Sequence, residues 1–83
     1  MNYRSRTEIV SMILDAVNSG ATKTKIMYKA MLSYNQLKNY LYIMLENNLV
    51  EYYDETKTFR ITEKGLNFLK MHKEIAKLFM AKS

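Results

Sequence analysis

The sequence predicts a mainly helical fold that contains one β-hairpin. Two observations indicate this: apolar residues recur every three or four positions through most of the chain, and this spacing changes to alternation only between residues 49 and 61. The chain has 83 residues, with no cysteine, no proline and no Gly/Ser-rich linker. We therefore expect one small domain that folds without disulfide bonds.

The first helix is predicted from about Ser5 to Asn18. Its buried face is marked by an apolar stripe that consists of Ile9, Met12, Ile13, Ala16 and Val17. Ser5 and Glu8 have the spacing of a capping box, so the helix should begin there. Asn18 and Gly20 can each take the left-handed conformation that ends a helix.

Two shorter helices follow, joined by a tight connection. One is predicted over about Lys23 to Ala30, with Thr22 or Thr24 as its N-cap and Ala21-Thr22 as a candidate very short strand before it. The next begins at the capping box of Ser33 and Gln36 and ends at Asn47-Asn48. Its predicted core stripe is Leu37, Leu41, Met44 and Leu45, with Tyr40 beside it.

Aromatic and β-branched residues then predict the hairpin. Its strands are expected over 49–53 and 58–61, joined by a polar turn over 54–57. Tyr52 and Tyr53 are adjacent in a strand, so one should face the core and the other the surface. The last helix should open at Thr62 and run to about Ala81. This order of elements predicts a winged helix-turn-helix with a long C-terminal helix.

The last helix has more apolar surface than one domain needs. Phe68, Met71, Ile75 and Leu78 follow a heptad pattern, and Leu66, Leu69, Ala76 and Phe79 form a second stripe. One stripe can cover the body, and the other would be exposed in a monomer, which indicates an interface. The predicted dimer contacts are Phe68, Met71, His72, Ile75, Leu78 and Phe79. An amphipathic helix on a membrane surface is the alternative, because lysines flank the stripe.

The net charge of +5 suits a polyanionic partner. Residues 1–32 and 62–83 each carry +3, whereas residues 51–61 carry −1. The candidates for phosphate contact are Arg4, Arg6, Lys23, Lys25, Lys29 and, at a helix N-terminus, Ser33. In the hairpin the candidates are Thr56, Lys57 and Arg60. Ordinary solvated lysines are the alternative interpretation of the basic residues.

The polar side of the third helix is the candidate for reading bases. It carries Tyr34, Asn35, Lys38, Asn39 and Tyr42, at spacings that place them opposite the core stripe. Asparagine can pair with adenine and lysine with guanine, while tyrosine more often contacts phosphate, sugar or a thymine methyl group. A plain solvated face, or a contact surface for another protein, would also fit this pattern.

Several segments resemble a family of small archaeal winged-helix DNA-binding proteins. They are residues 20–30, 32–37, 40–41, 48–52 and 59–66, so the resemblance covers nearly the whole chain. It implies a homodimer joined by an antiparallel coiled coil of the last helices, with the third helix in the DNA major groove. It implies no cofactor and no catalytic activity. Asn48 stands where the family usually has glycine, and Asp54 and Glu55 make this hairpin more acidic than a typical DNA-gripping wing.

The composition also argues against an enzyme. Two glycines exclude a Gly-rich phosphate loop, and one histidine without cysteine makes a metal site unlikely to form in a monomer. We expect residues 1–65 to bind DNA and residues 62–83 to form the dimerisation helix of one domain. The predicted function is double-stranded DNA binding by a cytoplasmic, nucleoid-associated homodimer that regulates transcription, with no membrane and no small-molecule substrate. A low-specificity architectural chromatin protein and a protein-interaction module are the alternatives.

Overall fold

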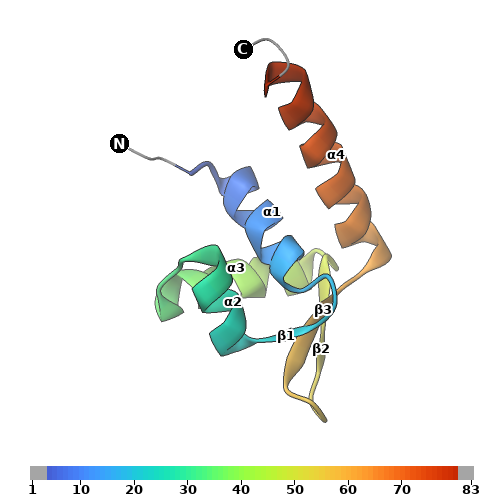
Figure 1. The fold of residues 1–83 in the computed structure, drawn as a ribbon. Helices are drawn as coiled ribbons and strands as arrows, with labels where there is room; N and C mark the ends of the chain where they lie inside the picture. The colour runs from blue at the N-terminus through green and yellow to red at the C-terminus, as the bar shows by residue number, and fades with distance from the viewer. Residues whose placement is uncertain (1–3, 81–83) are drawn as a thin grey trace.

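The computed structural model describes residues 4–80, which form four helices and a three-stranded antiparallel sheet (Figure 1). The elements are α1 (Arg6–Ala16), β1 (Ala21–Thr22), α2 (Lys23–Ala30), α3 (Tyr34–Glu46), β2 (Val50–Tyr53), β3 (Thr58–Ile61) and α4 (Glu63–Met80). The strand order is β1-β3-β2, so the short strand β1 pairs with the hairpin through β3. The fold class predicted from the sequence is confirmed.

Side-chain caps determine where the helices begin. Ser5 and Ser33 form the capping boxes predicted for α1 and α3. Thr22, rather than Thr24, caps α2, because its side chain accepts a hydrogen bond from the Lys25 amide at 3.3 Å. Thr62 Oγ1 likewise accepts from the Gly65 amide at 3.0 Å at the start of α4. These local bonds explain why the predicted helix starts are accurate.

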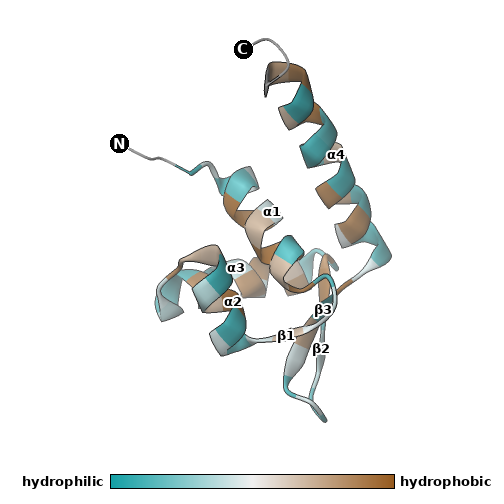
Figure 2. Ribbon diagram, viewed as in Figure 1, coloured by the Kyte–Doolittle hydropathy of each residue, from teal (hydrophilic) through white to brown (hydrophobic). Residues whose placement is uncertain are grey.

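The helix α1 is the centre of the core. In Figure 1 it lies between α2 and α4, with α3 running behind it. Ile13 and Val17 from its predicted stripe are fully buried, but so is Leu14, which lies outside that stripe. Because α4 packs on a second side of α1, the buried surface of this helix is wider than one stripe. Figure 2 shows the apolar residues gathered where these helices meet.

Two predicted positions in the core are wrong. Leu45 is 38% exposed, because the C-terminal half of α3 faces the hairpin across an open groove. Tyr52 and Tyr53 are 43% and 44% exposed, so neither is a core residue. Tyr52 lies on the inner face of the hairpin and packs on Phe59, with ring centroids 4.8 Å apart, but no other element covers its outer side.

The helix α4 has two distinct halves. In the first half, Leu69 is buried and Phe68 is partly buried against the core, so Phe68 is not an exposed residue of the predicted interface stripe. Lys73 Nζ then lies 3.2 Å from Asp15 Oδ1 and ties α4 to α1. Beyond this ion pair the helix projects from the body (Figure 1).

Within residues 4–80, no helix has the length and apolarity that crossing a bilayer requires.

The start of α4 sits directly against the end of α3. Asn48 follows α3 with φ of 59°, the left-handed conformation that the sequence predicts for an asparagine at this end. Its carbonyl accepts a hydrogen bond from Thr62 Oγ1 at 2.6 Å. A Cβ atom on Gly65 would lie 2.2 Å from the carbonyl oxygen of Leu49, so only glycine fits this crossing.

Candidate nucleic-acid interface

The helix α3 presents the predicted polar face to solvent. Its buried side consists of Leu37, Leu41 and Met44, which anchor it in the core. All five predicted base-reading residues are exposed on the remaining surface: Tyr34, Asn35, Lys38, Asn39 and Tyr42. The capping box at Ser33 fixes the first turn of this helix. The structure therefore brings the five candidates together on one accessible helix surface.

Lys23 of α2 makes a cation–π contact with this surface. Its Nζ lies over the ring of Tyr34, 5.3 Å from the ring centroid. A cation held over an aromatic face contributes about 0.5–1 kcal/mol at an exposed site. The contact holds the N-terminal turn of α3 beside the first residue of α2 and keeps a positive charge next to the exposed face.

Cationic side chains flank α3 on two sides. On one side, Arg6 of α1 lines a shallow groove with Asn39, Tyr40 and Ile43 of α3. On the other side, an open groove of about 600 Å³ separates α3 from the hairpin. Its lining consists of Thr22, Lys23, Thr24, Leu45, Tyr52, Lys57 and Phe59. Leu45 and Tyr52 could not be recognised as groove residues from the sequence, because only the folded hairpin brings them together.

The three hairpin candidates do not share one surface. Lys57, with φ of 56°, lines the groove that faces α3, and its Nζ lies 3.4 Å from Asp54 Oδ1. Thr56 exchanges a hydrogen bond of 2.6 Å with the Thr58 hydroxyl. Arg60 pairs in register with Glu51, on the opposite face from the groove residue Phe59. Only Lys57 of these three is therefore a groove residue.

Comparison with known proteins agrees with this arrangement. The sequence matches the winged helix-turn-helix family over residues 3–80, which is nearly the full chain. This chain belongs to the winged helix-turn-helix family. In this family's terms, α2 and α3 are the helix-turn-helix and the β2–β3 hairpin is the wing.

One solved structure is closely similar to this chain over most of its length. It is that of Sso10a-2, a DNA-binding protein from Sulfolobus solfataricus, with 26% sequence identity and a TM-score of 0.84. The match covers 95% of this chain and 90% of that chain. These findings confirm the resemblance to small archaeal winged-helix DNA-binding proteins. A comparison with functionally curated proteins finds no significant match.

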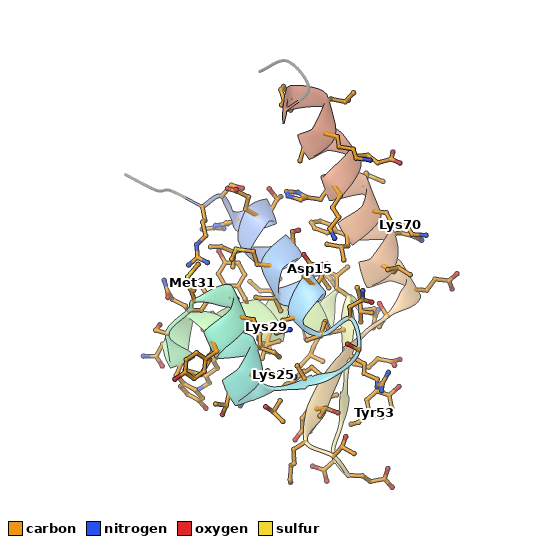
Figure 3. All side chains as sticks on the ribbon, viewed as in Figure 1. Asp15, Lys25, Lys29, Met31, Tyr53 and Lys70 are labelled. Atoms are coloured by element: carbon orange, nitrogen blue, oxygen red, sulfur yellow. The ribbon has the colours of Figure 1, made fainter. Side chains whose placement is uncertain are left out.

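Three predicted phosphate contacts lie away from the α3 face of this winged helix. Lys25 and Lys29 lie on the front of α2 in Figure 3, whereas α3 runs behind that helix. Lys29 lines a hollow with Met12, Asp15 and Ala16 of α1. The Arg4 guanidinium donates hydrogen bonds to the backbone carbonyls of Ala30 and Met31. Of the six phosphate candidates, Arg6, Lys23 and Ser33 remain beside the exposed face of α3.

Tyr53 lies on the outer side of the wing, away from α2 (Figure 3). Its hydroxyl donates to Glu51 Oε1 at 3.1 Å, and this hydrogen bond, together with the carboxylate charge, raises the Tyr53 pKa above its ordinary value of 10.0. Because the folded pKa is raised, the bond stabilises the wing below pH 10 and is lost as the pH rises through the folded pKa.

We expect the difference between alkaline titrations of the wild type and Tyr53→Phe, followed by tyrosinate absorbance, to have a midpoint above pH 10.0. In a Glu51→Gln background the same difference should have a lower midpoint, because the acceptor charge is gone. A midpoint that does not respond to Glu51→Gln would contradict the assigned cause.

Proposed function

We propose that this winged-helix protein binds double-stranded DNA as a homodimer and regulates transcription. The observation that carries the proposal is the exposed face of α3 with cations on both of its sides, Arg6 in one groove and Lys23 and Lys57 in the other. A recognition helix in a major groove has a phosphate backbone on each side, so it needs this pattern of charge. The similarity to a DNA-binding protein from Sulfolobus solfataricus supports the proposal.

In this proposal each element has one task. The α3 helix enters the major groove, which is about 12 Å wide and admits one helix. Asn35 and Asn39 offer donors and acceptors that match adenine, and Lys38 offers donors that match guanine. The free amides at the start of α3, beside Ser33, bind a phosphate. Arg6, Lys23 and Lys57 contact the phosphates on either side.

The C-terminal part of α4, from Met71 onward, supplies the dimer contact. Its exposed apolar stripe consists of Met71, Ile75, Leu78 and Phe79. Pairing two such stripes buries them and presents two α3 helices to successive major grooves of one duplex. His72 is half-buried beside the stripe, and Phe68 sits at its inner end, where the helix meets the body.

In this proposal the protein binds DNA and catalyses no reaction. Because it binds DNA, it is located at the nucleoid. Among residues 4–80, no group of three His, Asp or Glu side chains is arranged to hold a metal ion. The grooves beside α3 are open rather than enclosed, and their lining residues suit a polymer that runs along the surface.

The test is fluorescence anisotropy of a labelled random duplex at about 50 mM and about 200 mM salt. A protein that makes six or more phosphate contacts should lose about 10³-fold or more in affinity between these concentrations. No binding at the lower concentration would contradict the proposal and favour a protein partner for the exposed face of α3.

Asn39→Ala separates a regulator from an architectural chromatin protein. On a site obtained by selection from random sequences, we expect the substitution to cost about 1–3 kcal/mol of binding free energy, with little effect on random DNA. Asn67→Ala is the control, because Asn67 is an exposed helical asparagine on another helix, α4. Equal losses on both DNAs, or failure to select any site, would favour the chromatin protein.

A further inference from the structure

The C-terminal end of α2 is closed by a residue from outside the helix-turn-helix. At this end the Leu32 amide donates to the Met27 carbonyl at 3.1 Å, and the Met31 amide to the Tyr28 carbonyl at 3.4 Å. Met31 itself is in the left-handed conformation, with φ of 53°. The last carbonyls at this end, of Ala30 and Met31, both accept hydrogen bonds from the Arg4 guanidinium, which reaches Met31 O at 2.9 Å.

This contact has three favourable properties. A guanidinium can donate two hydrogen bonds at once in a fixed geometry, which an ammonium group cannot match. Its positive charge lies at a helix C-terminus, where the helix dipole favours a cation. It also satisfies backbone acceptors that have no partner within the helix. If Arg4 turned away to bind a phosphate, these three favourable interactions would be lost. The Arg4 side chain is therefore committed to this intramolecular contact.

The contact joins two parts of the chain that are 26 residues apart in sequence. Arg4 immediately precedes Ser5, which caps the central helix α1. Ala30 and Met31 lead into the tight turn before α3, in which Leu32 is buried and Ser33 is the N-cap of α3. Arg4 thus ties the start of α1 to the turn that sets the direction of α3.

We propose that Arg4 is a positioning residue: it fixes the α2–α3 turn and thereby the orientation of the exposed face of α3, and it makes no phosphate contact. The proposal rests on the DNA-binding function proposed above. Tyr34 and Asn35 lie in the first turn after this connection, so they are the residues that a loosened turn displaces most directly. An arginine that contacts phosphate raises the affinity for all DNA sequences alike. A positioning arginine instead raises the affinity for the selected site relative to random DNA.

Arg4→Gln and Arg6→Gln form a matched pair, because each removes one positive charge and the two positions flank Ser5, the N-cap of α1. Arg6 is exposed beside α3 and is the proposed phosphate contact. We expect Arg6→Gln to reduce the slope of log K against log salt by about 0.9 for each protomer that contacts DNA, which is about 1.8 for the dimer. We expect Arg4→Gln to leave this slope within about 0.2 of the wild type and to lower the preference for a selected site over random DNA about tenfold.

Ser5→Ala is the control for loss of stability alone, because it removes the capping box of α1 beside Arg4 without touching the turn. Both Arg4→Gln and Ser5→Ala should lower the unfolding midpoint by about 4–8 °C. Measured well below that midpoint, Ser5→Ala should keep the wild-type site preference. A reduced salt slope in Arg4→Gln, or a site preference as high as that of Ser5→Ala, would overturn the proposal.

Amide hydrogen exchange measured without DNA tests the positioning role of Arg4 independently of DNA binding. The amides of Gln36 and Leu37 are bonded to Ser33 in the first turn of α3. Arg4→Gln should accelerate their exchange at least severalfold more than Ser5→Ala does, and unchanged exchange would count against a positioning role. If the wild type binds no DNA, the proposed function fails, while this measurement still decides whether Arg4 holds α3.

Discussion

Replacing Ile75 by glutamate is expected to dissociate the proposed dimer and to weaken DNA binding about 100-fold or more. Ile75 lies within the exposed stripe of α4, in which Met71, Ile75, Leu78 and Phe79 are 64%, 50%, 70% and 74% exposed. A carboxylate there would lose its hydration on dimerisation without gaining a partner, which is costly. A monomer would then bind one half-site and lose the gain from two linked contacts.

The Ile75→Glu result has a direct control. Lys77→Gln changes the net charge by the same amount on the polar side of α4, so it should keep both the dimer and most of the DNA affinity. Molar mass from sedimentation equilibrium and anisotropy on one duplex measure the two effects. A wild type that stays monomeric at micromolar concentration, or an Ile75→Glu variant that remains dimeric, would refute the proposed interface. Because this half of α4 projects from the body, the monomer should retain its circular dichroism spectrum.

Gly65→Ala is expected to destabilise the fold by about 3 kcal/mol, the upper part of the usual range for overpacking. An added Cβ would lie 2.2 Å from Leu49 O, 2.9 Å from Ile61 Cγ1 and 3.2 Å from Leu14 Cδ2. The first of these atoms is backbone and cannot turn aside. The start of α4 must therefore move away from the end of α3, and its contacts with the core move with it.

Helix propensity predicts the opposite sign for this substitution. In an exposed helix, alanine in place of glycine is favourable by about 1 kcal/mol. Urea unfolding of Gly65→Ala, with Lys70→Ala as the control, decides between the two. Lys70 points outward from α4 (Figure 3), so Lys70→Ala should change stability by no more than about 0.5 kcal/mol. An unchanged or increased stability of Gly65→Ala would show that the crossing has room for a Cβ.

Features carried by short stretches of sequence could be predicted, because neighbouring residues create them. The capping boxes that begin at Ser5 and Ser33 each need only residues three apart, and both are confirmed. The change from helical to alternating spacing placed the hairpin, and Asn48 correctly marked the end of α3. The caps depend on hydrogen bonds between residues three apart, and the hairpin depends on two strands that follow each other directly in the sequence.

Features that depend on which element covers a face could not be predicted in this way. Periodicity places Leu45 on the same side of α3 as the core stripe, but no element lies close enough to cover it. It also groups Phe68 with Ile75, although the body buries part of one and leaves the other exposed. Residues on one stripe lie on the same face of a helix, but they can differ in how deeply they are buried.

The candidate site shows the same limit for charge. The exposed face of α3 follows from helical spacing, which predicts all five of its residues. Arg4 and Arg6 are equivalent in the sequence, yet one is bound to two backbone carbonyls and the other is exposed. Lys25 and Lys29 add to the net charge but lie on the other side of α2 from α3 (Figure 3). Charge counts predict a class of partner and not the direction of each side chain.

The division of α4 at the Lys73–Asp15 ion pair separates two kinds of constraint along one helix. Before it, one side of the helix packs on the core through Phe68 and Leu69, so the residues on that side must fit the fold. After it, the length of the helix determines how far the dimer contact lies from the domain. Each turn adds 5.4 Å, so the position of the pairing stripe along this half would set the separation of the two α3 helices. In the proposed dimer, lengthening or shortening this half would change the spacing of the DNA half-sites while leaving the domain itself intact.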